Sequence, residues 1–162
     1  MGGSIGAWLV RAGQLVLFVD TDEQRARVMR DAGLKIFGPV DEFSLDADCV
    51  HPSDVTSEIT TVFLAVKAHH TEASVQAIEP LLARDAVVVS IQNGLNDFVI
   101  ATAVDDNRPI RSFVNFGADA LHPVEVIRGW HLSVETTHEV DHPGDRFLAE
   151  GDSLPSGGHG WV

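Results

Sequence analysis

Cysteine and lysine are scarce in this sequence, and it has no long apolar run. Cys49 is the one cysteine, which excludes an internal disulfide framework and fits a reducing compartment, so we expect a cytoplasmic protein. The only lysines are Lys35 and Lys67, and 24 acidic residues bring the formal net charge to −13. This charge argues against a nucleic-acid partner and against anionic membranes. No apolar run approaches the roughly 20 residues of a membrane span, and no basic-then-apolar leader is expected.

The length and composition fit one globular domain. A chain of 162 residues is long enough for one hydrophobic core and short for two. The hydrophobic share of 44%, with 14 glycines and 7 prolines, is ordinary for such a domain. Beyond about Thr136 the pattern fades, and Pro155 with the run 156–158 is typical of irregular chain. We therefore expect a folded domain over residues 1–135 and an irregular or disordered tail over 136–162.

Residues 62–94 carry the strongest pattern. The runs 62–66 and 86–91 are apolar and β-branched, as in strands that are covered on both faces. Between them Thr71 is a candidate N-cap of a helix. One face of that helix is apolar, formed by Val75, Ile78, Leu81 and Leu82. A strand, a crossover helix and a strand of this length place both strands parallel. Ligands bind beyond the carboxyl ends of such strands, so we expect Lys67 and the turn 92–94 beside a ligand.

Further elements are expected on both sides of this unit. Those before it are a helix over 2–12 ended by Gly13, a strand over 15–19, a helix from Asp22 to Ala32 ended by Gly33, short strands over 34–37 and 43–45, and a polar loop over 51–54. Those after it are a helix that follows Gly94 and runs to about Val104, a strand over 110–116, and strands over 124–127 and 131–134, antiparallel if 128–130 is a tight turn.

The runs 63–68 and 88–95, read as FLAVKA and VVSIQNGL, together resemble the amino-terminal domain of the ketopantoate reductase family, the 2-dehydropantoate 2-reductases. The run 113–118 fits the strand that follows in that domain, and the resemblance covers about residues 1–130. It implies a Rossmann-type, doubly wound, mostly parallel α/β sheet. It also implies NADPH- or NADH-dependent reduction of a 2-keto acid, 2-dehydropantoate to pantoate, in pantothenate biosynthesis. For the intact protein we expect a small-molecule 2-keto acid substrate and a homodimer.

The family begins with a strand and a G-x-G-x-x-G turn, whose backbone approaches a pyrophosphate at a helix amino terminus. Two registers fit this sequence. In one, residues 1–6 are the motif, Met1 takes the first glycine position and the helix is about one turn short. In the other, Gly2 is the third glycine and the helix runs its usual length to Gly13. We prefer the second register, which needs no deletion and implies that the first strand, the central one in the order 3-2-1-4-5-6, is missing.

The family's second domain is helical and carries a lysine general acid and a substrate-binding glutamate. The sequence ends before any such domain, and no lysine follows Lys67. We therefore assign no catalytic residue, and we expect this chain alone to lack turnover.

Lys67 and Asn93 resemble family residues on the nicotinamide and substrate side of the site. An ammonium at Lys67 can meet a carboxylate or phosphate oxygen, although a solvated strand-end lysine is the simpler alternative. Asn93 with Gly94 is also a good turn-forming pair without any ligand. The expected cofactor contacts are Lys67, Asn93 and Gly94, together with Gly2 at the phosphate turn and Asp20.

Asp20 ends the second strand of the expected Rossmann unit. A carboxylate there can accept both ribose hydroxyls of NAD and repels a 2′-phosphate. Family members that use NADPH tend to carry an arginine just after this point, where Thr21 stands here. NADH is therefore favoured slightly over NADPH. Arg25 could still reach a phosphate, so NADPH stays an alternative.

Other readings of the sequence stay open. His138 and His142 have helical metal-ligand spacing, but Pro143 follows at once, so we expect a solvated loop and no metal. His69 and His70 precede the crossover helix, either lining the crevice or exposed. The rival functions are another two-domain dehydrogenase, of 3-hydroxyacid or sugar-phosphate type, and a non-catalytic nucleotide-binding remnant.

Overall fold

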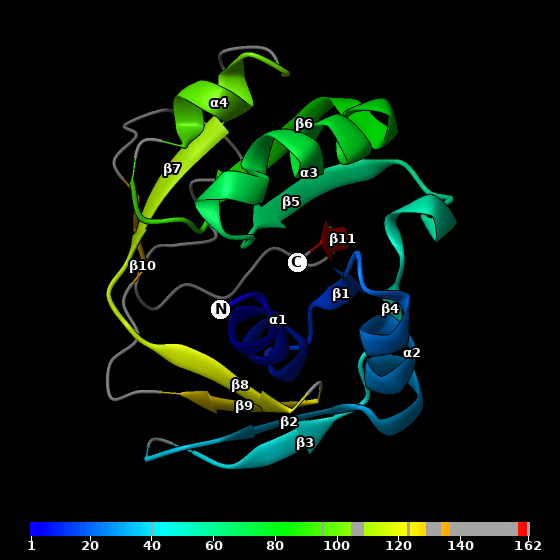
Figure 1. Ribbon diagram of the computed structural model, residues 1–162, viewed down its shortest axis with the longest axis vertical. Helices are drawn as coiled ribbons and strands as arrows, with labels where there is room; N and C mark the ends of the chain where they lie inside the picture. Colours follow the sequence, from blue (N-terminus) through cyan, green and yellow to red (C-terminus); the bar gives the residue numbers. More distant parts are fainter. Residues whose placement is uncertain are drawn as a thin grey trace.

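Two β-sheets form the framework of this computed structural model, which describes residues 1–39, 41–94, 96–104, 109–122, 124–128, 134–136 and 159–161. A seven-stranded sheet has the order β10-β7-β6-β5-β11-β1-β4, and a four-stranded sheet has the order β3-β2-β9-β8. All neighbours in the larger sheet are parallel except β10 and β7. Helix α1 lies between the β11–β1 part of the larger sheet and the smaller sheet (Figure 1).

The elements have the following bounds. The α-helices are α1 (Gly2–Arg11), α2 (Glu23–Ala32), α3 (Thr71–Ile78) and α4 (Asp97–Ala101), and the 3-10 helices are η1 (Pro52–Asp54), η2 (Ala68–His70) and η3 (Glu79–Leu81). The strands are β1 (Leu15–Val19), β2 (Leu34–Phe37), β3 (Phe43–Leu45), β4 (Cys49–Val50), β5 (Ile59–Leu64), β6 (Leu82–Ser90), β7 (Pro109–Val114), β8 (Ala118–His122), β9 (Glu125–Arg128), β10 (Val134–Thr136) and β11 (His159–Trp161).

The larger sheet is covered on both faces, as its apolar strands require. Alternate residues of β5 and β6 point to opposite sides. Val62 and Val88 pack with Val75 of α3 and Ile100 of α4 on one face. On the other face the neighbouring strand residues pack with Ile5 of α1. The fold is therefore a doubly wound α/β sheet of Rossmann type, as the sequence predicts.

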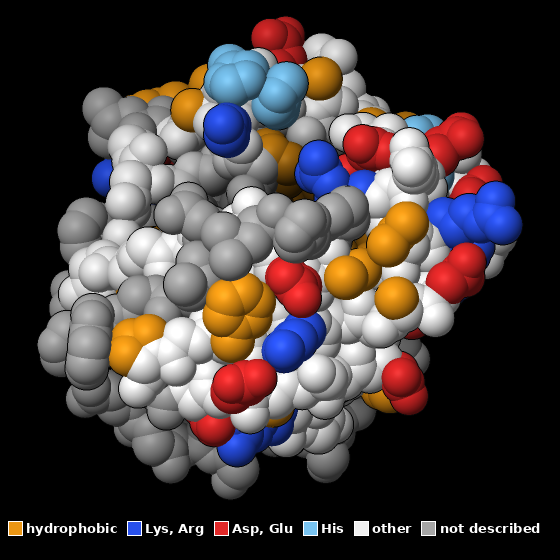
Figure 2. Space-filling view, turned by 60° about the horizontal axis from the view of Figure 1, so that its bottom comes forward, with side chains coloured by type: hydrophobic (Ala, Val, Ile, Leu, Met, Phe, Trp, Pro, Cys, Tyr) orange, Lys and Arg blue, Asp and Glu red, His pale blue; other side chains and the backbone are white. Residues whose placement is uncertain are grey.

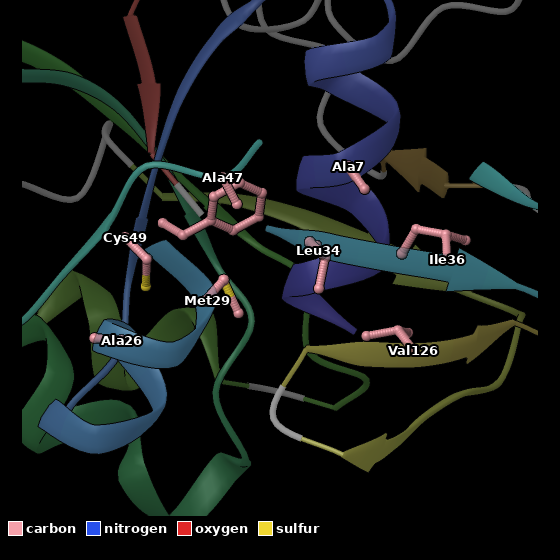
Figure 3. Packing of buried hydrophobic residues seen from close by; sticks show 9 residues of the cluster. Ala7, Ala26, Met29, Leu34, Ile36, Ala47, Cys49 and Val126 are labelled. Atoms are coloured by element: carbon pink, nitrogen blue, oxygen red, sulfur yellow. The ribbon is translucent and has the colours of Figure 1, made fainter. Parts of the chain in front are cut away.

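A third apolar cluster joins α1 and α2 to both sheets. Its buried residues are Ala7, Phe18, Ala26, Met29, Leu34, Ile36, Ala47, Cys49 and Val126, most of which are labelled in Figure 3. Gly6 of α1 lies against the ring of Phe18, so close that a Cβ there would be 2.4 Å from the ring carbon Cε1. Glycine at this position lets α1 approach β1 closely.

The amino-terminal elements agree with the sequence prediction. Helix α1 ends before Gly13, whose φ is +86°. The Asp22 carboxylate accepts a hydrogen bond from the Arg25 backbone N–H at 3.1 Å and caps α2. Gly33 ends α2 with a φ of +75°, where a Cβ would lie 2.5 Å from the Leu45 carbonyl oxygen, so only glycine fits. The two short strands after it are confirmed as the antiparallel pair β2 and β3.

The centre of the larger sheet holds a strand that the sequence did not predict. As expected, no strand precedes α1 in the described residues, and β11 from the end of the chain lies in the central position, between β1 and β5. Residues 159–161, which we expected in an irregular tail, form β11. Residues 137–158 lie outside the described part.

Three local predictions are wrong in detail. Thr71 is the first residue of α3, not its N-cap, which is His70, and Leu82 belongs to β6. Helix α4 ends at Ala101 and is shorter than expected. The expected strand over 124–127 is present as β9, which pairs with β8 and β2. Residues 129–133, which include most of the other expected strand and of the turn before it, lie outside the described part, and Val134 begins β10, which pairs with β7.

Candidate functional site

Three neighbouring stretches of chain follow parallel strands at one edge of the larger sheet. Asp20 directly follows β1, Lys67 follows β5, and residues 92–94 follow β6. Leu64 and Ser90 are register partners, so β5 and β6 end side by side. Since β11 stands between β1 and β5, the Asp20 end is separated from the Lys67 end by one strand. The carboxyl edge therefore presents the predicted residues in one row.

Gln92 fixes the geometry where β5 and β6 end. Its side-chain Nε2 donates to the Val66 carbonyl oxygen at 2.7 Å and to Thr71 Oγ1 at 2.8 Å. Its Oε1 accepts a hydrogen bond from Ser90 Oγ at 3.2 Å. With only 5% of its surface exposed, Gln92 ties the residue before Lys67 to the first turn of α3.

Asn93 is held by the next strand. Its Nδ2 donates to the Val114 carbonyl oxygen at 2.9 Å, and its Oδ1 accepts from the Val114 backbone N–H at 3.1 Å. Both polar ends of the amide are therefore engaged with β7. The following Gly94 has a φ of +115°, in the region that favours glycine.

Lys67 is exposed where η2 begins. Its carbonyl oxygen accepts a hydrogen bond from the His70 backbone N–H at 2.8 Å, which closes the short helical turn that leads into α3. The rings of His69 and His70 lie 4.0 Å apart between centroids. Both histidines are exposed, and Figure 2 shows pale-blue histidine side chains gathered on one face of the molecule. The end of β5 thus carries exposed basic and imidazole groups.

Asp20 is paired at the end of β1. Its Oδ1 accepts from the Asp22 backbone N–H at 2.9 Å, and its Oδ2 accepts from Arg25 Nη1 at 3.2 Å. The Asp20 side chain is 25% exposed and that of Arg25 is 51% exposed. A carboxylate and a guanidinium therefore stand together at the position expected for the adenosine ribose.

The start of α1 contributes backbone donors. Gly2 and Gly3 begin the helix, where the first N–H groups have no partner within the helix. The Ser4 hydroxyl, fully buried in this first turn, has no hydrogen-bond partner in the described part of the protein. Helix α1 precedes β1 and runs back along the sheet, so its start lies at the same carboxyl edge as Asp20.

An ion pair beyond Asn93 was not foreseen. Arg111 of β7 contacts Asp97, the first residue of α4, and this contact raises the pKa of the Arg111 guanidinium. The pair joins α4 to β7 behind the 92–94 turn. Gln92 was recognised as part of the motif, but its bonding was not foreseen, because its partners lie 21 and 26 residues away in sequence.

Neither a metal site nor a membrane-spanning helix is found among the described residues. No group of three or more His, Cys, Asp or Glu side chains there could hold a metal ion. His138 and His142 lie outside the described part. None of the helices described is both long and apolar enough to cross a membrane.

This chain spans about half the length of the following solved structures, which have the same fold. A D-mandelate dehydrogenase in ternary complex with NADH and anilino(oxo)acetate aligns with a TM-score of 0.83 and 22% identity, over 100% of this chain and 54% of that one. A 2-dehydropantoate 2-reductase from Geobacter metallireducens GS-15 aligns with a TM-score of 0.73 and 24% identity, over 81% of this chain and 44% of that one. A PanE/ApbA family ketopantoate reductase from Ralstonia eutropha JMP134 aligns with a TM-score of 0.74 and 22% identity, over 97% of this chain and 51% of that one.

Comparison with curated proteins gives no match. The family model for ketopantoate reductase PanE/ApbA matches residues 1–137, most of the chain. The chain therefore belongs to the ketopantoate reductase PanE/ApbA family.

Proposed function

We propose that this chain forms the nicotinamide-dinucleotide-binding part of an oxidoreductase that reduces a 2-keto acid to a 2-hydroxy acid. The observation that carries the proposal is the row of Asp20, Lys67 and residues 92–94 along one carboxyl edge of a parallel sheet. Ligands of doubly wound sheets bind at this edge. The family gives the proposed substrate, 2-dehydropantoate, and the single cysteine supports a cytoplasmic location.

The residues at this edge fit a dinucleotide. The partly exposed Asp20 carboxylate can accept ribose hydroxyls, and the start of α1 offers backbone N–H groups and a positive helix pole to the pyrophosphate. Lys67 supplies an exposed ammonium toward a phosphate or substrate carboxylate. The dinucleotide, when bound, supplies the hydride. The protein orients the reactants and places charge around them.

Asn93 has a more restricted role in this proposal. Its amide already bonds both polar groups of the Val114 backbone. We therefore propose that Asn93 and Gly94 shape the turn beside the nicotinamide, and that the Asn93 side chain meets a ligand only where a lone pair or a second N–H remains.

Cofactor choice depends on Asp20 and Arg25. The ion pair between them neutralises part of the carboxylate charge that would repel a 2′-phosphate. Because the Asp22 backbone N–H still orients Asp20 toward its role as a hydroxyl acceptor, we propose NADH over NADPH. A structure of similar fold, the D-mandelate dehydrogenase, contains NADH.

The mandelate enzyme also bears on the substrate. It holds anilino(oxo)acetate with NADH, so a 2-keto acid with an aromatic substituent is the second candidate substrate. A ketopantoate reductase from Staphylococcus aureus, similar with a TM-score of 0.59, is described as dimeric. We propose a homodimer for the intact protein as well.

The test is a calorimetric titration of the purified chain with NADH and with NADPH. We expect both to bind, with NADH tighter. Lys67→Ala should weaken binding about 10-fold or more, the loss of one charge-assisted contact of roughly 1.4 kcal/mol. Lys35→Ala is the matched control, because Lys35 pairs with Glu42 on the smaller sheet at 3.4 Å, and it should bind like the original chain.

Two outcomes would contradict the proposal. A chain that unfolds cooperatively but binds neither nucleotide at millimolar concentration has no dinucleotide site. Clearly tighter NADPH binding, lost in Arg25→Ala, would reverse the cofactor preference. Adding 2-dehydropantoate or anilino(oxo)acetate to the NADH complex then compares the two substrate classes.

A further inference from the structure

The centre of the larger sheet is formed by the last strand of the chain. β11 pairs in parallel with β1, where His159, Gly160 and Trp161 are the register partners of Leu15, Val16 and Leu17. On its other side it pairs in parallel with β5, where Gly160 and Trp161 are the partners of Thr61 and Val62. Figure 1 shows this strand in red between the blue β1 and the teal β5.

β1 and β5 do not pair with each other in the larger sheet. Without β11 the sheet would divide into a β1–β4 part and a β5–β6–β7–β10 part. Each part would expose a row of backbone N–H and C=O groups along a new edge, and such edges are costly and prone to pairing with other chains. Three residues of β11 therefore connect the two parts of the sheet.

The direction of β11 gives it a second role. Helix α1 leads into β1, and β11 is the parallel neighbour of β1 on the side of β5. A strand, a helix and a parallel neighbouring strand form a βαβ unit. β11, α1 and β1 have this arrangement, with the first strand supplied from the other end of the chain. The carboxyl end of β11 and the start of α1 accordingly lie at the same edge of the sheet.

We propose that the space between β1 and β5 is a strand-binding groove and that the chain's own residues 159–161 fill it. The occupied groove completes the βαβ unit in permuted order and holds the two parts of the sheet together. A second copy of the chain could offer the same residues to the groove, so the test separates these two sources. The readouts involve no nucleotide, and their outcome is thus independent of the proposed function.

Backbone direction makes the test specific. The Phe18 N–H donates to the Asp48 carbonyl oxygen at 2.8 Å, and the Asp20 N–H donates to the Val50 carbonyl oxygen at 3.1 Å, so both face β4. Because strand residues alternate in direction, the Leu17 N–H faces β11. Hydrogen exchange at Leu17 therefore reports the groove, and exchange at Phe18 reports the opposite side of the same strand.

The variant Gly160→Pro removes one backbone donor from the middle of β11 and obstructs pairing in a central strand. We expect exchange at Leu17 to become about 100-fold faster or more, with a much smaller change at Phe18. Gly157→Pro is the control, the same change before the strand begins, and it should leave both rates as they are. Unchanged exchange at Leu17 in Gly160→Pro would overturn the proposal.

A rearranged chain covers the case in which Gly160→Pro does not fold. Residues 151–162 are moved ahead of Met1 through a Gly-Gly linker. Since the groove and its strand are kept, we expect one cooperative unfolding transition and slow exchange at Leu17, as in the original chain. Non-cooperative unfolding or fast exchange at Leu17 would overturn the proposal.

The source of the strand is settled by concentration. A monomer in size-exclusion chromatography whose exchange at Leu17 does not depend on protein concentration supports filling by the same chain. A dimer whose Leu17 protection is lost on dilution would show that a second copy supplies the strand, and would overturn filling by the same chain.

Discussion

Asn93 and Val114 are joined by two hydrogen bonds, in which the asparagine amide pairs with both backbone groups of the valine. The Nδ2 to O distance is 2.9 Å and the N to Oδ1 distance is 3.1 Å. The pairing resembles one step of a strand ladder, made by a side chain, and it extends the contact between β6 and β7 beyond the end of β6. A residue expected to face the nicotinamide thus also holds the sheet edge in place.

Asn93→Asp should destabilise the protein because a carboxylate cannot donate to the Val114 carbonyl oxygen. We expect the free energy of unfolding to fall by about 1–2 kcal/mol, the cost of leaving a partly buried carbonyl group without its donor. Urea unfolding followed by circular dichroism measures this. Asn96→Asp is the control, since Asn96 makes only a 3.5 Å contact to the Asn93 carbonyl oxygen. Equal stabilities of Asn93→Asp and the original chain would show that the pairing contributes nothing.

Gln92→Met should cost more, because Gln92 is nearly fully buried and serves three partners. Methionine has a similar length but leaves the Val66 carbonyl and the Thr71 and Ser90 hydroxyls without this amide. We expect a loss of about 2–4 kcal/mol in the free energy of unfolding.

Gln76→Met is the matched control for that variant. Gln76 is exposed on α3 and makes only a 3.4 Å contact with Glu72. Its replacement should change the free energy of unfolding by less than about 0.5 kcal/mol. A loss in Gln92→Met no larger than in this control would mean that water or rearranged neighbours satisfy the three groups.

Gly6→Ala should weaken the packing of α1 on β1. The added Cβ would lie 2.4 Å from Phe18 Cε1 and 2.8 Å from Cζ, and the Phe18 ring, only 3% exposed, has little room to move. Overpacking of this kind costs about 1–3 kcal/mol, which thermal unfolding would show as a lower Tm. Gly117→Ala, where no atom lies within 4 Å of the new Cβ, should leave the Tm nearly unchanged. A Tm of Gly6→Ala equal to that of this control would mean that α1 can shift away from β1 without cost.

Local signals explain which parts of the fold could be predicted. Asp22 caps α2 and Gly33 ends it through their own side chain and backbone, so both bounds followed from neighbouring residues. The strand at 118–122 was missed because its partner β9 and the contact of β9 with β2 are set by pairing across the chain. β11 was missed for a stronger reason. Its three residues, with Gly160 in the middle, show no strand pattern, and its place depends on the edges of β1 and β5, about 100 residues or more away.

The candidate site shows the same division. Strand ends can be predicted from the sequence, so the positions of Asp20, Lys67 and Asn93 at the carboxyl edge followed from the apolar runs that precede them. The hydrogen bonds and ion pairs of these residues could not be predicted. Arg25 is paired with Asp20, and Asn93 with Val114, through contacts that depend on how α2 and β7 pack. Sequence patterns therefore predicted which residues lie at the carboxyl edge, while the structure determines how their polar atoms are bonded.

The stability contributed by Cys49 should depend on pH. Its thiol is fully buried in β4, and burial, followed by the charges of Asp20 and Asp48, raises its pKa from 9.0 to about 11. Below pH 9 the thiol is protonated in both states. Above pH 9 the unfolded chain loses this proton while the folded protein keeps it until about pH 11, so ionisation favours unfolding across that window.

The difference in unfolding free energy between the original chain and Cys49→Ala measures this effect, because other titrating groups cancel. From pH 8 to pH 10 we expect the original chain to lose about 1 kcal/mol of unfolding free energy relative to Cys49→Ala, because the pKa of its thiol is higher in the folded state than in the unfolded state. Urea unfolding at both pH values gives the number, and the reaction of the folded protein with a thiol reagent should be slow at pH 8. A difference that stays constant with pH, or a thiol that reacts as fast as in the unfolded chain, would show that Cys49 is open to solvent.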